Sequence, residues 1–572
     1  MKPSVFIPLI LILAATLPAA AQDLPEMVPV KPDRAEEKAP TPSQTAMSDP
    51  LFVESIEVRV IEIEVFVTDR DGNPVTGLTR DDFELIHDGQ ETAISNFYAV
   101  EGGEVKLGIE APDEEAVAAP PPLPKKQPLN LVIYIDNFNI HQFNRKKVLK
   151  ALKTFLRGDL APDDRVMMVT YDRSLIINNT FTTDHARIIS TINEIDEKGG
   201  DRVFYEQDRR DLLNEIAESA NAAQMIPRVE NFAESVYNEL RFSLDALNEL
   251  VGFLAGIEGR KALIYVSDGL PMTAAEELFY AIEEKSEQSG AMLRSMSFKA
   301  DRRFEEVIMA ANANQITLYT IDAAGHRDIS GADAQDRARN FSGHIDTVTA
   351  LNMQSSLKLI SGETGGQAVT NTNNILGGLQ RMAQDFTSYY SIGFKPGHAG
   401  DGQFHRTRVK VKRDGLTVRQ RRGYRDQPAS KKMEEGTVSS LVLGYQDNPL
   451  GFDMRTGAHQ PYEDGTYIVP IEVRIPIGKL TLLNRAGAHQ GRVLITVAAR
   501  KDNGDISPVQ EHVLPISIPE ADWETAQKQV YTYEMSLVMA PGFQRMAVGV
   551  KDELAAEISY VARTIRVGKD GE

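Results

Sequence analysis

Short apolar runs alternate with amphipathic segments through the middle of the chain. Leu131 to Ile135 is a wholly apolar run that ends at Asp136, and a second apolar run over 262–267 ends at Asp268. A short apolar run bounded by turn residues is typical of a buried strand in a parallel sheet, whereas apolar residues three and four apart predict a helix. Further strands are expected over 165–171, 175–177, 316–321 and 367–369. The alternation predicts an α/β domain over 128–425, a doubly wound sheet with helices on both faces.

A long helical segment interrupts this alternation. Residues 201–256 carry an almost continuous helical pattern with one apolar stripe. The stripe consists of Phe232, Val236, Leu240, Leu244, Leu247, Val251 and Leu254. Such a stripe usually packs into a core. Because the segment follows the presumed ligand edge of the sheet, it is also our candidate for an element that confers specificity.

Alternating apolar and polar residues predict strands on both sides of the α/β domain. Residues 51–109 alternate in this way and contain the turn sequences Asp69–Pro74 and Asp88–Gly89, which predicts a small β domain. Residues 438–572 hold short β patterns at regular spacing, which favours a β sandwich. Residues 389–424 are also β-like, and we expect them to add antiparallel strands to the central sheet. Their Arg and Lys residues would protect its edge.

The remaining segments have the composition of a leader and of linkers. Lys2, an apolar stretch over 5–17 and Ala19-Ala20-Ala21 predict a signal peptide over 1–21. Residues 22–50 lack apolar periodicity and read as a disordered linker. Residues 110–127 form a stiff, Pro-rich linker, and 426–437 a polar one.

Composition restricts the class of protein. The chain has 572 residues, too many for one core. Asp plus Glu outnumber Lys plus Arg by 82 to 62, and the net charge of −20 argues against nucleic acid and anionic membranes as partners. Beyond the leader no segment is apolar over a membrane-spanning length. The absence of cysteine excludes disulfides and thiol nucleophiles. We therefore expect an exported, bacterial protein, periplasmic or extracellular, without a membrane span in the mature chain.

The candidate chemistry lies where the two apolar strands end. Open α/β sheets bind ligands at the carboxyl edge, so Asp136 and Asp268 are expected to face one site. Asn137 and Asn139 follow the first strand, and carboxylate and amide oxygens suit Mg²⁺ or another divalent cation. The alternative interpretation is that each Asp caps the next helix. No GxSxG elbow is present, and the ten histidines are scattered without HExxH-type spacing, so no enzyme is predicted.

Five stretches together resemble a known family: VFVTDRDGNPVTGLTRDDFELIHDGQ, NLVIYIDNFNI, KALIYVSDGLP, FTSYYSIGFKP and RQRRGYR. They are similar to the von Willebrand factor type A domain and, more narrowly, to secreted VWFA-related proteins of Acidobacteria, over roughly Phe52 to Tyr424. The family pattern, Asp-x-Ser-x-Ser plus a Thr and a second Asp, implies a metal-dependent adhesion site. By position the acids are Asp136 and Asp268, but Phe138 and Ile140 replace the two Ser.

The resemblance therefore implies a degenerate site. The Thr position falls near residues 199–203, where Asp201 stands and no Thr is present. The candidate ligands are Asp136, Asn137, Asn139, Asp201 and Asp268. The leading hypothesis is a secreted, non-catalytic binding or assembly protein that presents this edge to a protein partner. A metal-dependent hydrolase, with a water activated between Asp136 and Asp268, and a purely structural envelope protein with a dead metal site are the alternatives.

Overall fold

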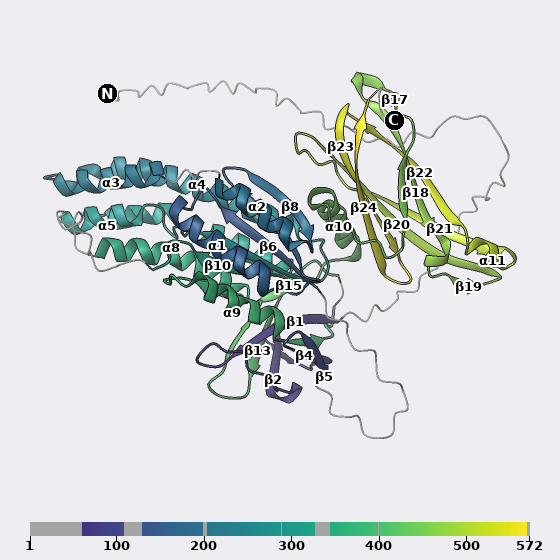
Figure 1. Ribbon diagram of the computed structural model, residues 1–572, viewed down its shortest axis with the longest axis horizontal. Helices are drawn as coiled ribbons and strands as arrows, with labels where there is room; N and C mark the ends of the chain where they lie inside the picture. The colour runs from purple at the N-terminus through teal and green to yellow at the C-terminus, as the bar shows by residue number, and fades with distance from the viewer. Residues whose placement is uncertain are drawn as a thin grey trace, which may run out of the picture.

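The computed structural model describes residues 60–107, 128–197, 203–287, 289–326, 344–398 and 400–568. The predicted signal peptide, the linkers at 22–50 and 110–127, and Asp201 lie outside these residues. A mixed α/β sheet occupies the middle of the described chain, with β-rich segments before and after it (Figure 1). The predicted combination of an α/β sheet with flanking β segments is confirmed. No helix of the described residues is long and apolar enough to cross a bilayer.

The central sheet has six strands. Their order across the sheet is β11 (Ala368–Val369), β10 (Ile316–Asp322), β9 (Arg260–Ser267), β6 (Leu129–Asp136), β7 (Arg165–Tyr171) and β8 (Leu175–Thr182). All neighbours are parallel except β7 and β8, which are antiparallel. Every residue of β6 and β9 is buried, which explains the apolar runs over 131–135 and 262–266, although β6 also contains Asn130 and β9 begins with Arg260 and Lys261.

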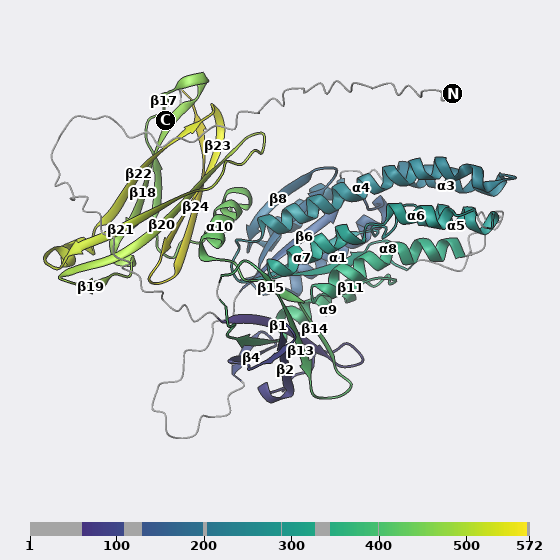
Figure 2. The same cartoon turned by 180° about the vertical axis from the view of Figure 1, so that it is seen from behind.

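Helices cover both faces of this sheet (Figures 1 and 2). On one face, α1 (Gln142–Gly158), α2 (His185–Glu197) and α9 (Ile375–Thr387) pack against Leu131, Ile133 and Ile135. On the other, α4 (Ile226–Phe253), α7 (Asp301–Ala313) and α8 (His344–Glu363) pack against Val132 and Tyr134. Alternate side chains of one strand thus enter two separate cores.

A second group of helices extends beyond the sheet on the side away from the C-terminal strands (Figure 1). It comprises α3 (Val203–Glu218), the first turns of α4, α5 (Glu276–Lys285), α6 (Ala291–Ser295) and the start of α8. These helices share their own apolar cluster, which includes Ile216, Val229 and Phe279. The helical pattern expected over 201–256 is therefore two helices, α3 and α4, with a break near Ser219 and a short 3-10 turn over Ala222–Met225.

The β strands at 389–425 belong with the N-terminal strands, so the prediction that they extend the central sheet is wrong. One sheet has the order β14-β1-β12-β4-β5 and the other β15-β13-β2-β3. The N-terminal strands are β1 (Ile61–Thr68), β2 (Phe83–His87), β3 (Gln90–Thr92), β4 (Asn96–Glu101) and β5 (Glu104–Leu107). The later strands are β12 (Tyr389–Phe394), β13 (Phe404–Val411), β14 (Thr417–Gln420) and β15 (Gly423–Arg425).

The physical reason is a shared core. Tyr390, Ile392 and Phe394 of β12 enter one apolar cluster with residues of β1, β2 and β4. The basic side chains that suggested edge protection have acidic partners instead. Lys410 of β13 lies 2.9 Å from Glu84, and β13 is an interior strand.

The segment expected to be a polar linker, 426–437, is largely helical. Helix α10 (Ala429–Leu443) lies between the central helices and the C-terminal sheets. Small and hydroxyl-bearing residues make this close approach possible: a Cβ added at Gly436 would lie 2.0 Å from the Tyr560 hydroxyl. The Thr437 hydroxyl donates to the carbonyl of Met433, 2.9 Å away, within the same helix. Its buried apolar residues are Met433 and, at its end, Leu441, Val442 and Leu443, so residues 426–437 alone have the composition of a polar linker.

The C-terminal strands form two sheets with one apolar cluster between them. The first contains β16 (Asp453–Thr456), β17 (Gln460–Pro461), β18 (Tyr467–Pro476) and β22 (Val530–Met539). The second contains β19 (Leu483–Arg485), β20 (Ala488–Lys501), β21 (Gln510–Pro519), β23 (Gly542–Asp552) and β24 (Glu557–Val567). Val469 and Ile471 of β18 share this cluster with Ile495 and Val497 of β20.

Candidate functional site

Asp136 ends β6 and its side chain is fully buried. Its carboxylate accepts three hydrogen bonds: from the Asn139 backbone N–H at 3.0 Å, from Asn139 Nδ2 at 2.9 Å and from the Tyr265 hydroxyl. Burial, together with the Asp136 charge, raises the pKa of Tyr265 well above its ordinary value, so this hydroxyl remains a donor. The Asp136 carboxylate thus holds the turn that follows its own strand and the adjacent strand β9.

Asp268 follows β9 at the same edge of the sheet, because β6 and β9 are parallel neighbours. Its carboxylate accepts from the His141 backbone N–H at 2.7 Å and from Asn144 Nδ2 at 3.1 Å. Both donors belong to the start of α1, where the helix dipole favours a negative charge. The Asp268 backbone N–H donates to the Asn139 carbonyl at 2.9 Å. Asn139 therefore contacts both acids.

The two asparagines predicted as ligands are engaged within the chain. Asn137 Oδ1 accepts from Nη1 of Arg145 at 3.3 Å, and the Arg145 side chain is completely buried. Asn139 Nδ2 also donates to the Ser243 hydroxyl, 2.9 Å away on α4. A buried guanidinium beside Asn137 opposes a second cation at that position. The alternative interpretation, in which each Asp caps the helix that follows its own strand, is wrong: the N-cap of α1 is His141 and that of α5 is Ala275.

The structure brings Asp136, Asn137, Asn139 and Asp268 to one edge, whereas Asp201 is not among the described residues. Within the described part of the chain, three or more His, Asp or Glu residues converge to within 4.8 Å in two groups, and neither Asp136 nor Asp268 belongs to them. Sequence reasoning missed Tyr265 and Asn144, which hold the two carboxylates. Both are ordinary strand and helix residues, so no sequence pattern indicates their role.

A pocket of about 420 Å³ opens beside Asn139. Pockets that bind small ligands measure about 300–1,000 Å³. Its lining combines aromatic and apolar side chains with an ion pair. Phe138, Phe232 and Met353 supply the apolar surface, and the loop Gly269–Pro271 forms one wall. The Arg173 guanidinium lies 5.0 Å from the centre of the Phe138 ring and 3.7 Å from the Glu239 carboxylate. We call this the edge pocket.

The electrostatics of the edge pocket are set by Glu239 and Arg173. Burial raises the pKa of Glu239, although the nearby Arg173 charge acts in the opposite direction. Arg173 is itself largely exposed, with a side-chain exposure of 73%. Asp208, which is exposed, also lines the pocket, so its described lining carries one cation and two acids beside the aromatic and apolar side chains.

The histidines are scattered along the sequence, but three of them lie close together in the structure. His87, His398 and His405 meet in the N-terminal pair of sheets, together with Asp88, Asp401 and Asp426. The signal that sequence reasoning overlooked is the spacing His398-x-x-Asp401-x-x-x-His405 around a turn, with a His87-Asp88 pair before another turn.

Comparisons with known proteins identify no family. No family model matches the chain, and no curated protein matches it. One similar solved structure is a von Willebrand factor type A protein from Catenulispora acidiphila: identity is 8%, 85% of this chain and 72% of that chain are covered, and the TM-score is 0.22. Another is an aerotolerance-related membrane protein from Bacteroides fragilis: identity is 12%, coverage 45% and 98%, and the TM-score 0.22.

A third similar structure is the conserved hypothetical protein BatB from Bacteroides thetaiotaomicron, at 11% identity, with 46% of this chain and 98% of that chain covered and a TM-score of 0.19. At such TM-scores none of these likenesses supports an inference about function. Function is therefore argued from the geometry of the chain itself.

Proposed function

We propose that this chain is an exported, non-catalytic binding or assembly protein whose edge pocket receives a segment of a protein partner. In this proposal the central unit is a von Willebrand A-like, doubly wound sheet and the C-terminal unit is a β sandwich that acts as a spacer. The observation that carries the proposal is the edge pocket itself. It lies at the carboxyl edge of the sheet, where α/β proteins bind their ligands, and it combines an aromatic floor with a rim cation.

Exposed apolar side chains support a macromolecular partner. Phe143, at the start of α1, is 71% exposed, and Leu351, two residues before the pocket residue Met353 on α8, is 56% exposed. Large apolar side chains in water are favourable anchors for a partner surface. A small, fully enclosed ligand would leave these residues unused, whereas a polypeptide segment would cover them.

The buried state of the two acids favours binding over hydrolysis. A metal-activated water requires open coordination positions on its metal and ligand oxygens that are free to bind it. The Asp136 carboxylate instead accepts three hydrogen bonds, and Asp268 holds the start of α1. In the proposed function these acids fix the loops that form the edge pocket, and the partner contacts Phe138 and Arg173.

The test is recovery of partners from a native envelope extract with immobilised chain variants. Arg173→Glu reverses the rim charge of the edge pocket. Arg241→Glu makes the same change on α4, at a side chain that does not line the pocket. The proposal expects a protein that is retained by the unmodified chain and by Arg241→Glu, but lost with Arg173→Glu, and that a chelator does not release.

Two results would favour the alternatives. Equal recovery by all three chains would support the purely structural protein. Turnover on a panel of ester, phosphoester and peptide substrates, abolished by Asp136→Asn or Asp268→Asn, would support the metal-dependent hydrolase.

A further inference from the structure

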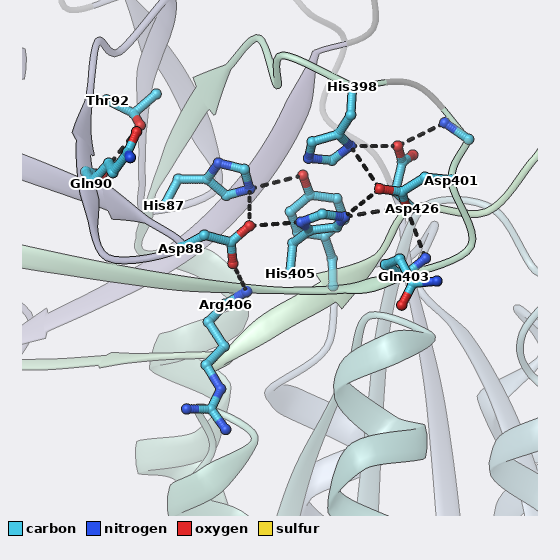
Figure 3. Close-up of polar contacts among 12 residues, drawn as sticks. His87, Asp88, Gln90, Thr92, His398, Asp401, Gln403, His405, Arg406 and Asp426 are labelled. Carbon is cyan, nitrogen blue, oxygen red and sulfur yellow. Dashed lines mark hydrogen bonds and ion pairs between the residues drawn. The ribbon is translucent and has the colours of Figure 1, made fainter.

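Six acidic and imidazole side chains from distant parts of the sequence gather at one end of the N-terminal sheets. His87 ends β2 and Asp88 begins the following turn, whereas His405 lies on β13, which pairs with β2. His398 and Asp401 belong to the loop between β12 and β13, and Asp426 follows β15. Figure 3 shows the three imidazoles facing one another, with Asp401 and Asp426 on the outer side.

The inner part of this cluster has the composition of a metal site. Nδ1 of His405 lies 2.7 Å from Oδ2 of Asp88, and Nε2 of His87 lies 3.6 Å from the same oxygen. The rings of His398 and His405 are 3.7 Å apart. One ligand atom from each of His87, Asp88, His398 and His405 lies within 4.8 Å of the other three. Four ligands around a zinc ion are about 3.3 Å apart, so small side-chain rotations would complete the geometry.

The outer acids hold two of the imidazoles in the orientation that metal ligands adopt. Asp426, fully buried, lies 2.9 Å from Nδ1 of His398. Asp401 lies 3.1 Å from Nε2 of His405. A carboxylate on one ring nitrogen fixes the tautomer and directs the lone pair of the other nitrogen toward a metal. The second nitrogen of His398, Nε2, is on the inner side of the cluster, and the second nitrogen of His405, Nδ1, faces Asp88 (Figure 3).

An unsatisfied atom points to what the cluster lacks. Nε2 of His398 is buried and has no hydrogen-bond partner among the described residues. If Nδ1 donates its proton to Asp426, then Nε2 is a bare, buried lone pair, which is costly to leave without a donor or a cation. Within the described part of the chain, no neighbouring side chain donates a hydrogen bond to this lone pair. A metal ion bound to it would take that place.

We propose that His87, Asp88, His398 and His405 bind one transition-metal dication, with Zn²⁺ as the best match, and that Asp401 and Asp426 orient two of the imidazoles. Three nitrogens and one carboxylate oxygen suit Zn²⁺, whereas Mg²⁺ and Ca²⁺ prefer oxygen ligands throughout. Four protein ligands close the coordination sphere, so the site is structural. The ion would fasten the β2–β3 turn to the loop after β12, and thus join the segments that precede and follow the α/β unit.

The test uses the full chain without a histidine tag, freed of metal by a chelator and then titrated with Zn²⁺ in competition with a chromophoric chelator. One equivalent is expected to bind, and Co²⁺ in its place should give the visible absorption of a four-coordinate site. Zn²⁺ should also raise the melting temperature of the N-terminal sheets. His398→Ala should abolish stoichiometric binding, and Asp401→Asn should weaken it by about 10- to 100-fold.

Two matched variants separate this site from other histidines and from the carboxyl edge. His512→Ala removes a histidine of the C-terminal sheets, and Asp136→Asn alters the carboxyl edge; both should bind Zn²⁺ like the unmodified chain. Absence of stoichiometric Zn²⁺ and Co²⁺ binding by the unmodified chain would overturn the proposal without any variant. Unchanged affinity in a folded His398→Ala chain would overturn it as well.

Discussion

Two neighbouring tyrosines allow a direct test of how the carboxyl edge is held together. Tyr134 on β6 and Tyr265 on β9 are register partners, with ring centres 5.3 Å apart and side chains that are almost completely buried. The Tyr265 hydroxyl donates to the buried carboxylate of Asp136. The Tyr134 hydroxyl is buried and has no hydrogen-bond partner among the described residues. The two side chains therefore share size and burial, and differ in the hydrogen bonding of their hydroxyls.

Removing each hydroxyl should have opposite effects on stability. Tyr265→Phe removes a hydrogen bond to a charged acceptor and leaves one Asp136 oxygen buried with fewer donors, which costs about 1.5–3 kcal/mol. Tyr134→Phe removes a hydroxyl that is buried without a partner, so the free energy of unfolding should stay the same or rise by up to about 1 kcal/mol. Since the rings remain in place, neither change opens a cavity.

The assay is urea denaturation of both variants and of the unmodified chain, followed by a probe of the α/β unit, such as hydrogen exchange in β6 and β9. Local exchange is preferable because a chain with several units does not unfold in one step. Equal destabilisation by the two substitutions, or a larger cost for Tyr134→Phe, would refute the argument that the Asp136 carboxylate depends on its hydrogen-bond donors.

Two further predictions concern the buried charges at the opposite edge of the sheet. Glu64 lies between the buried guanidiniums of Arg260 and Arg421, so Glu64→Gln should cost about 3–5 kcal/mol. Glu62 lies on the same side of β1 but is exposed, so Glu62→Gln should cost less than about 1 kcal/mol; thermal unfolding compares the two variants. Burial lowers the pKa of Lys261 to about 7 from an ordinary 10.5. Between these values the unfolded chain binds more protons than the folded one, so stability should rise by about 2 kcal/mol from about pH 7 to about pH 9, and Lys261→Met should remove this rise in urea denaturation.

The strands of the central sheet were predictable because burial on both faces leaves an unmistakable signature. β6 and β9 are apolar through their middle, and an acid ends β6 or directly follows β9, so their positions and the carboxyl-edge location of Asp136 and Asp268 follow from the sequence. Parallel neighbours necessarily end at one edge. What the acids do there was not predictable, because Tyr265 and Asn144 become their donors only through packing between separate elements.

Elements that depend on distant partners were assigned wrongly or missed. The β pattern of 389–394 shows that a strand forms, but not that β12 lies between β1 and β4, some 300 residues earlier. Helix α10 shows no apolar stripe over 429–437, because Gly436 and Thr437 make close contacts there and most of its buried apolar residues come later, at Leu441, Val442 and Leu443. The histidine cluster has the same origin: His87 and His405 are far apart in sequence and meet only because β2 pairs with β13.

The two edges of the central sheet have different surroundings. At the amino edge, Glu64 of β1 binds Arg260 at the first position of β9, so the N-terminal sheets are fixed to the sheet by a buried ion pair. Those sheets contain both segments that flank the α/β unit, and a metal at His87 and His405 would hold the same segments together. In the proposed function the partner binds at the opposite, carboxyl edge. There Asp136 and Asp268 hold the loops around the edge pocket through hydrogen bonds instead of facing solvent.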